Sequence, residues 1–138
     1  MADNAPFSVN RAPYPNVHVN LPGRLECYLI SAVGANGSVT TTTAASSAGC
    51  SVTYVGEGNY SFAFPAGGTG AIGWVQVTPP EQPGEAVTDA RFYCIDSDIL
   101  NFATGAGRFS AVDGSATPAL SDIIGTFRIV VYVLRAAT

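Results

Sequence analysis

The sequence contains no lysine. Its six basic residues are all arginines, set against ten acidic residues, which gives a net charge of -4. A protein whose main ligand is nucleic acid needs a clustered cationic face, so this balance argues against nucleic-acid binding. Charged residues make up only 12% of the chain, about half the share of roughly 25% in ordinary globular proteins. We therefore expect a surface that is largely small and uncharged, or covered by partners.

Histidine and cysteine are also scarce, with one histidine, His18, and three cysteines, Cys27, Cys50 and Cys94. A nucleophilic triad needs a base that titrates near neutral pH, and the lone histidine lies in a proline-rich stretch unsuited to rigid catalytic geometry. The cysteines form no C-x-x-C pattern and fall in apolar runs, so we expect buried free thiols; one disulfide with a leftover thiol is the alternative. We predict no metal site, no cofactor and no enzymatic activity.

Neither a signal peptide nor a membrane-spanning run is found in the sequence. The first 17 residues, MADNAPFSVNRAPYPNV, lack a basic region followed by an apolar run. No stretch approaches the roughly 18 apolar residues of a membrane span. We therefore expect no membrane partner and a chain that is made and folded in a cytoplasm.

Two further patterns resemble motifs that bind cations or phosphate groups. Asp96 and Asp98 have a D-x-D spacing that can direct two carboxylates at one cation, but the same residues are expected in a loop that caps a short helix at Ile99. The glycine-rich stretch 67–70 lacks the lysine of a phosphate-binding loop, and the one at 105–107 is followed by no helix-forming run. We interpret both glycine-rich stretches as turns.

Residues 1–24 differ from the rest of the chain. They hold four of the nine prolines and no sustained helix or strand period. Proline fixes φ and removes a hydrogen-bond donor, so this stretch is predicted to be extended and to lie outside a sheet. It nevertheless carries apolar residues that a solvated linker would not need. We favour a docking arm that binds through Phe7, Val9, Tyr14 and Val17; a disordered terminus is the alternative.

Residues 25–138 read as strands separated by glycine-rich turns and are predicted to form one β-domain. The expected strands are 25–33, 38–43, 50–55, 59–64, 72–78, 89–95, 108–112 and 123–135. Several alternate apolar and polar residues with the period of two of a half-buried strand. Short glycine turns at 34–37 and 56–59 are predicted to close hairpins. The pattern indicates an all-β fold, an antiparallel β-sandwich or jelly roll of about seven to eight strands, preceded by the extended N-terminal arm.

The last predicted strand is apolar on both faces. Phe127, Ile129, Val131 and Val133 define one face. The other face contains Val130, Tyr132 and Leu134, in a position that a simple sandwich would leave wet. A strand buried on both sides lies in the middle of a layered stack or at a subunit interface, so these three residues are candidates for a contact between copies. Trp74 is expected in the core or at an interface, with a sugar-stacking platform as the alternative.

The segment 52–64, VTYVGEGNYSFAF, resembles a hairpin of small β-domains in bacteriophage virion proteins. In these domains a strand and a short glycine turn are followed by a strand with the pattern G-x-Y-x-x-x-F. They occur in tail-fibre tips, head fibres and capsid decoration (cement) proteins. The terminal segment 125–134, GTFRIVVYVL, is similar to the closing strand of such domains. Many of them form trimers around a three-fold axis, like the jelly rolls of the complement C1q and tumour-necrosis-factor type.

The resemblance implies a structural virion protein without catalytic residues. A tail-fibre protein would carry a long N-terminal shaft, which this sequence lacks, so the resemblance favours a capsid decoration protein. Its expected partners are the major capsid protein and further copies of itself in a homotrimer, on the exterior of the virion. The arm would bind the shell, and Val130, Tyr132 and Leu134 would form the trimer interface. The alternative is a receptor- or glycan-binding tip that uses the loops at 67–70 and 79–84.

Overall fold

The computed structural model describes residues 24–78 and 91–135 of the chain. Apart from one 3₁₀ helix, η2 (Thr43–Ala45), its regular elements are strands. The strands are β1 (Arg24–Ala35), β2 (Ser38–Thr41), β3 (Ser51–Gly56), β4 (Asn59–Ala63), β5 (Ile72–Thr78), β6 (Arg91–Ile95), β7 (Ala106–Asp113) and β8 (Gly125–Arg135). No helix in this part of the chain has the length and hydropathy to cross a membrane.

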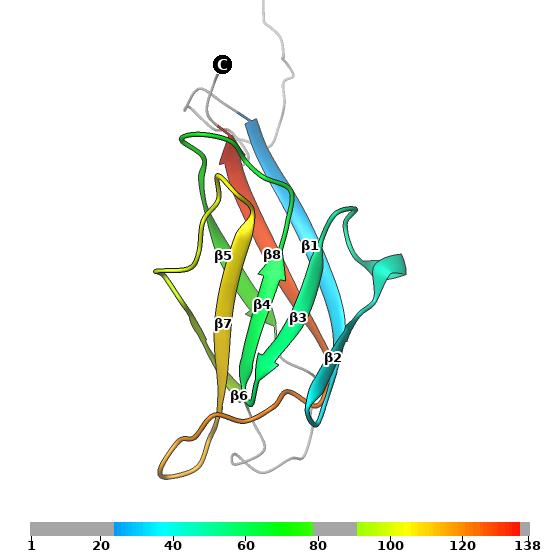
Figure 1. The fold of residues 1–138 in the computed structure, drawn as a ribbon, viewed down its shortest axis with the longest axis vertical. Coiled ribbons are helices and arrows are strands. Elements are labelled where there is room, and N and C mark those ends of the chain that lie inside the picture. Colours follow the sequence, from blue (N-terminus) through cyan, green and yellow to red (C-terminus); the bar gives the residue numbers. More distant parts are fainter. Residues whose placement is uncertain (1–23, 79–90, 136–138) are drawn as a thin grey trace, which may run out of the picture.

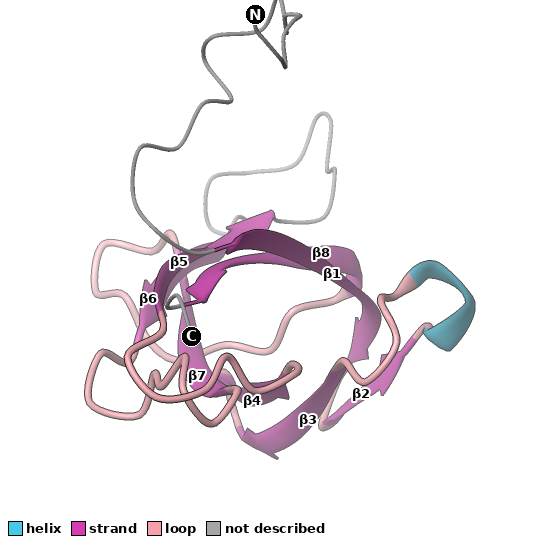
Figure 2. Ribbon diagram, turned by 90° about the horizontal axis from the view of Figure 1, so that it is seen from above, coloured by secondary structure: helices cyan, strands magenta, loops and turns pink. Residues whose placement is uncertain are grey.

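The strands form two four-stranded antiparallel sheets (Figure 1), so the predicted all-β sandwich is confirmed. One sheet, here called sheet A, has the order β2-β1-β8-β5, and the other, sheet B, has the order β3-β4-β7-β6. Figure 2 looks along the strands and shows β5, β8 and β1 in one layer opposite β7, β4 and β3 in the other. The long β1 and β8 pair along eleven registered positions, from Arg24 opposite Arg135 to Gly34 opposite Gly125. This long pairing makes β8 a central strand of sheet A.

Alternation along the strands builds the core between the sheets. Sheet A contributes Ile30 and Ala32 from β1 and the four predicted residues of β8, and all of them are at most 1% exposed. Sheet B contributes Val52, Tyr60, Phe62 and Phe109, none more than 5% exposed. The rings pack closely, with Tyr60 stacked on Phe109 at 5.2 Å and edge-on to Phe127 at 5.8 Å. Burying a large side chain contributes roughly 1.5–3 kcal/mol, so this core supplies the main stabilisation.

One carboxylate joins the turns of the two sheets at the end of the sandwich where the hairpins close. Asp122, only 8% exposed, accepts hydrogen bonds from the backbone N–H of Gly37 at 2.8 Å and of Gly58 at 2.9 Å. Its third donor is the Tyr54 hydroxyl at 3.2 Å. Gly37 lies in the β1–β2 turn of sheet A and Gly58 in the β3–β4 turn of sheet B. Both predicted hairpins are therefore present, and Asp122, in the loop between β7 and β8, links their turns by hydrogen bonds.

The two long sides of the sandwich differ. On the β2/β3 side, the Thr41 side chain links the sheets, because its Oγ1 donates to the Val52 carbonyl at 3.2 Å and accepts from the Val52 N–H at 3.0 Å. On the opposite side lie β5 and β6, the last strands of their sheets. Within the described residues, β8 is the one strand that pairs with β5, and β7 the one that pairs with β6. The β5/β6 side thus presents two strand edges.

Candidate functional site

The most distinctive surface of the molecule is the outer side of sheet A. Strand register sets its residues in three rows across β5, β8 and β1: Ile72, Leu134 and Leu25; Trp74, Tyr132 and Cys27; Gln76, Val130 and Leu29. Eight of these nine residues, all but Gln76, are apolar or aromatic, and we call these eight the apolar face. The nearest charged residue on this side of β8 is Arg128, in the next row between Thr78 and Ser31. A contiguous uncharged surface of this kind on a small protein typically marks an interaction site.

The large side chains of the apolar face are more exposed on β5 than on β1. Leu25 and Leu29 on β1 are 39% and 36% exposed, whereas Ile72 and Trp74 on β5 are 59% and 52% exposed. Trp74 stacks on Tyr132, with ring centroids 4.8 Å apart and planes 19° from parallel. Such a pair contributes about 0.5–1.5 kcal/mol beyond the area that it buries, and it orders the two rings face to face across β5 and β8. The face is therefore preorganised at its centre, and its most solvated side chains lie at the edge strand.

The outer side of sheet B has a different character. Many outward positions on β3, β4 and β7 are small or polar: Ser51, Thr53, Asn59, Ser61, Arg108 and Ser110. Ser61 lies opposite Arg108, and the Ser110 hydroxyl donates to the Asn59 side chain at 2.7 Å. The larger apolar side chains on this side are Val55 on β3, Phe92 on β6 and Val112 on β7 opposite Phe92. The sandwich therefore has one polar outer face and one apolar outer face.

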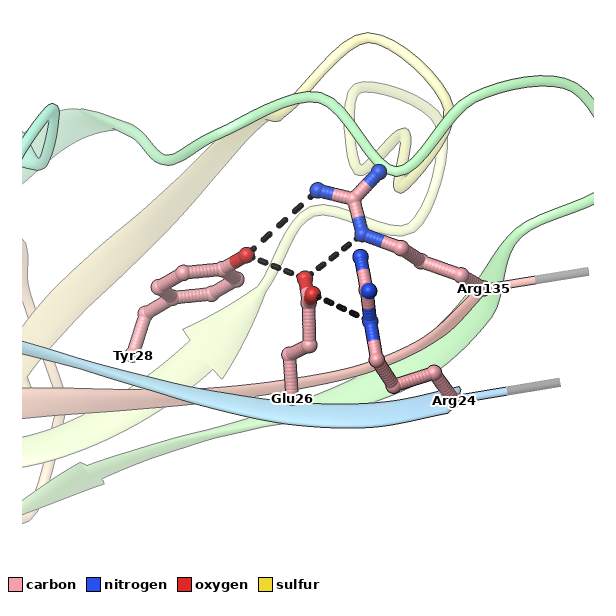
Figure 3. A network of polar contacts seen from close by, with 4 residues as sticks. All are labelled: Arg24, Glu26, Tyr28 and Arg135. Atoms are coloured by element: carbon pink, nitrogen blue, oxygen red, sulfur yellow. Dashed lines mark hydrogen bonds and ion pairs between the residues drawn. The ribbon is translucent and has the colours of Figure 1, made fainter.

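A polar network lies on the inner side of sheet A at the ends of β1 and β8 (Figure 3). Glu26 accepts a hydrogen bond from the Tyr28 hydroxyl and forms ion pairs with Arg135 at 2.6 Å and Arg24 at 2.8 Å. The hydrogen bonds from Tyr28 and Arg135 lower the pKa of the Glu26 carboxyl, while burial and the same carboxylate raise the pKa of Tyr28. Because Glu26 is held ionised by three partners, the network is a structural ion cluster rather than a poised acid or base.

The residues that the sequence offered as metal ligands form hydrogen bonds within their own loop instead. The Asp96 carboxylate accepts the N–H of Asp98 at 3.0 Å, as expected of a loop cap. The side-chain oxygen of Asn101, which follows this loop, accepts the N–H groups of Ala103 and Thr104. The described residues contain no group of three or more His, Cys, Asp or Glu side chains placed to hold a metal ion. These loops are therefore explained by their own hydrogen bonds.

The structure brings together the three residues predicted for a trimer interface. Val130, Tyr132 and Leu134 lie in consecutive rows on the outer side of β8, flanked on both sides by apolar residues. Sequence reasoning missed the flanking members on β1 and β5. The sequence pattern that could have identified them is the alternation of Leu25, Cys27 and Leu29 on β1 and of Ile72 and Trp74 on β5. The sequence does not reveal, however, that these two strands pair with β8. The predicted arm residues Phe7, Val9, Tyr14 and Val17 lie outside the described residues.

The expected burial of the cysteines is wrong for two of them. Cys50 is buried in the core, where desolvation raises the pKa of its thiol. Cys27 and Cys94 are free and exposed. Each alternates with core residues and so points outward, Cys27 on sheet A and Cys94 on sheet B. Trp74, at 52% exposed, is likewise excluded from the core and belongs to the outer face.

Comparisons with known proteins return no match, whether against protein-family models, curated proteins or solved structures.

Proposed function

We propose that the protein is a non-enzymatic structural module that associates with copies of itself through the apolar face, and that it serves as a homotrimeric capsid decoration protein. The observation that carries the proposal is the contrast between the two outer sides of the sandwich. Water contacts both in an isolated subunit, yet only sheet A presents three uncharged rows across three strands. Burying such a surface is favourable at roughly 25 cal/mol per Å² of apolar area.

The capsid assignment rests on the resemblance of segments 52–64 and 125–134 to phage virion β-domains. Segment 52–64 forms the β3–β4 hairpin, and segment 125–134 forms most of β8, which carries the middle of the apolar face. A trimer at a three-fold or quasi-three-fold point of a shell would bridge neighbouring capsomers. Three linked contacts bind far more tightly than one because the second and third are intramolecular. The arm, through Phe7, Val9, Tyr14 and Val17, would add contacts with the major capsid protein.

The proposal is tested by placing charges on the apolar face. Val130→Lys combined with Leu134→Lys puts two cations where copies would meet, and the native mass should fall from trimer to monomer with circular dichroism unchanged. Val55→Lys is the matched control, because Val55 is a valine on the outer side of sheet B and is 47% exposed. It should remain trimeric. Co-sedimentation with purified capsids should be lost with the trimer; a full-length chain that is monomeric and ignores capsids would refute the proposal.

A second candidate, a receptor- or glycan-binding tip, is favoured by the stacked Trp74–Tyr132 pair. An exposed indole beside Gln76 is the kind of flat platform on which sugar rings stack. This function predicts that Trp74→Ala abolishes glycan binding without changing the native mass. The decoration function predicts that the same variant weakens self-association.

A further inference from the structure

Among the described residues, the edge of β5 shows none of the features by which proteins protect an exposed strand edge. Such edges are usually short, bulged, charged or interrupted by proline. β5 has seven residues, IGWVQVT, without charge or proline, and it pairs with β8 in an unbroken register. The edges on the other side are protected. β2 has four residues, and β3 is irregular between Tyr54 and Gly56 and bonded to Thr41.

The apolar face also stays open at this edge. Ile72 and Trp74 are the most exposed large residues of the face because β8 covers them on one side only. A further strand beside β5 would cover them on the other side and satisfy backbone groups along the edge. Strand addition of this kind takes its affinity from main-chain hydrogen bonds and its specificity from alternate side chains.

The chain itself carries a segment suited to this position. Residues 17–21 read Val-His-Val-Asn-Leu, which alternates apolar and polar residues and is free of proline between Pro15 and Pro22. In an added strand, Val17, Val19 and Leu21 would share one side and could extend the apolar face beyond Ile72 and Trp74. His18 and Asn20 would then point toward the interior. There the Tyr93 hydroxyl of the edge strand β6 is buried without a hydrogen-bond partner.

Chain length decides which copy supplies the segment. The position beyond β5 is three strand spacings from β1, about 14 Å at about 4.8 Å each. Residue 21 precedes Arg24, the first residue of β1, by three residues, which span at most about 11 Å when fully extended. Residue 21 therefore cannot lie beside β5 of its own chain.

We propose that residues 17–21 of one copy add as a strand to the free edge of β5 in a second copy. The contact joins two different surfaces, and such heterologous contacts close into rings, as a trimer requires. This inference rests on the proposed self-association and names the segment that completes it. It assigns Val17 to the contact between copies and leaves Phe7, Val9 and Tyr14 for the shell.

The test is disulfide trapping between two differently tagged chains, both carrying Cys27→Ser and Cys94→Ser. One chain receives a cysteine at Val17, Val19 or Leu21 in turn, and the other receives Gln76→Cys on β5. Mixing and oxidation should give a disulfide-linked heterodimer for at least one of the three positions. Phe92→Cys, at another exposed site on the outer side of sheet B, is the control partner and should give none. A third chain that carries both the arm cysteine and Gln76→Cys is oxidised alone. The inference is overturned if no arm position links to Gln76→Cys, or if the link forms only within this doubly substituted chain.

A second measurement separates this inference from the proposed function. Val19→Pro removes a backbone donor from the added strand and should raise the concentration at which half the protein is trimeric by at least about tenfold. Val9→Pro should leave it unchanged. A full-length monomer at every concentration refutes the self-association itself. A trimer that is indifferent to Val19→Pro overturns only the strand addition.

Discussion

Asp122 links the hairpin turns of the two sheets through its hydrogen bonds, and its charge makes the stability of the fold depend on pH in the acid range. Burial raises the pKa of this carboxyl, but the N–H groups of Gly58 and Gly37 and the Tyr54 hydroxyl outweigh it and hold the pKa below its usual value. A carboxylate with a lowered folded pKa stabilises the protein fully above the pKa of the unfolded chain, about 3.9. That stabilisation is lost as the pH falls through the folded value.

Asp122→Asn should therefore lower the free energy of unfolding by about 2–3 kcal/mol at pH 7, because it weakens charge-assisted bonds and leaves a buried donor poorly satisfied. Urea denaturation at pH 7 and at pH 3 measures the effect. The difference from the unsubstituted protein should shrink at pH 3, where the native carboxylate is increasingly protonated. Asp98→Asn, at an exposed loop position, is the control and should change stability by less than about 0.5 kcal/mol. Equal losses for the two variants would contradict the assigned role.

The two glycines that donate to Asp122 provide a matched comparison. Both have positive φ, +81° at Gly37 and +68° at Gly58, so alanine carries the left-handed cost of roughly 1–2 kcal/mol at either position. A Cβ at Gly37 would meet open space, whereas at Gly58 it would lie 2.6 Å from the Ala111 carbonyl oxygen and 2.7 Å from the Ser121 nitrogen.

Gly58→Ala should accordingly destabilise the protein by at least about 1–2 kcal/mol more than Gly37→Ala, since overpacking against backbone adds to the conformational cost. Thermal or urea unfolding of the two variants gives the difference directly. Similar losses of stability in the two variants would mean that the backbone around Gly58 shifts to accommodate the added Cβ at little cost.

At the scale of elements, the sequence predicted the strands well but only two of their pairings, those of the hairpins closed by glycine turns. Alternation located all eight strands because each has one side in the core, and glycine turns located the two hairpins. The period of two does not say which strands pair, so the rows of the apolar face could not be assembled before β1 and β5 were seen on either side of β8. The same limit explains the error at Cys27 and Cys94. An apolar run around a cysteine predicts a strand, but the side to which the thiol points depends on register.

Thr41 provides the element-scale prediction, because one side chain links β2 of sheet A to β3 of sheet B. Thr41→Val keeps the side-chain volume and removes both hydrogen bonds to Val52, so unfolding should become easier by about 1–3 kcal/mol. Thr40→Val is the control, since the neighbouring Thr40 is exposed on the same strand. Hydrogen exchange of the Val52 amide should accelerate in Thr41→Val alone; unchanged exchange would show that this side is closed by packing instead.

At the scale of the whole molecule, the sandwich has two unlike outer faces, and the account of function depends on that asymmetry. A single folded subunit gains nothing from placing Trp74, Tyr132 and their neighbours toward water. Copies that bury this face against one another would gain the free energy of removing its apolar area from water. Residues 17–21 of one copy, added to β5 of the next, would fix how the copies are arranged in the trimer. The low overall charge and the absence of lysine agree with a protein whose surface is largely given to contacts.

The two exposed cysteines allow the most direct test of self-association through the apolar face, because one lies on the outer side of each sheet. Cys27 lies in the middle row of the apolar face, and Cys94 lies on the outer side of sheet B. Thiol labelling of the unsubstituted protein, followed by peptide mass analysis, should be run at concentrations well below and well above the association midpoint. The account predicts that Cys94 labels equally fast at both, while Cys27 becomes at least about tenfold slower when the protein is associated, because access limits thiol reactivity. Labelling of Cys27 at an unchanged rate in the associated protein would contradict it.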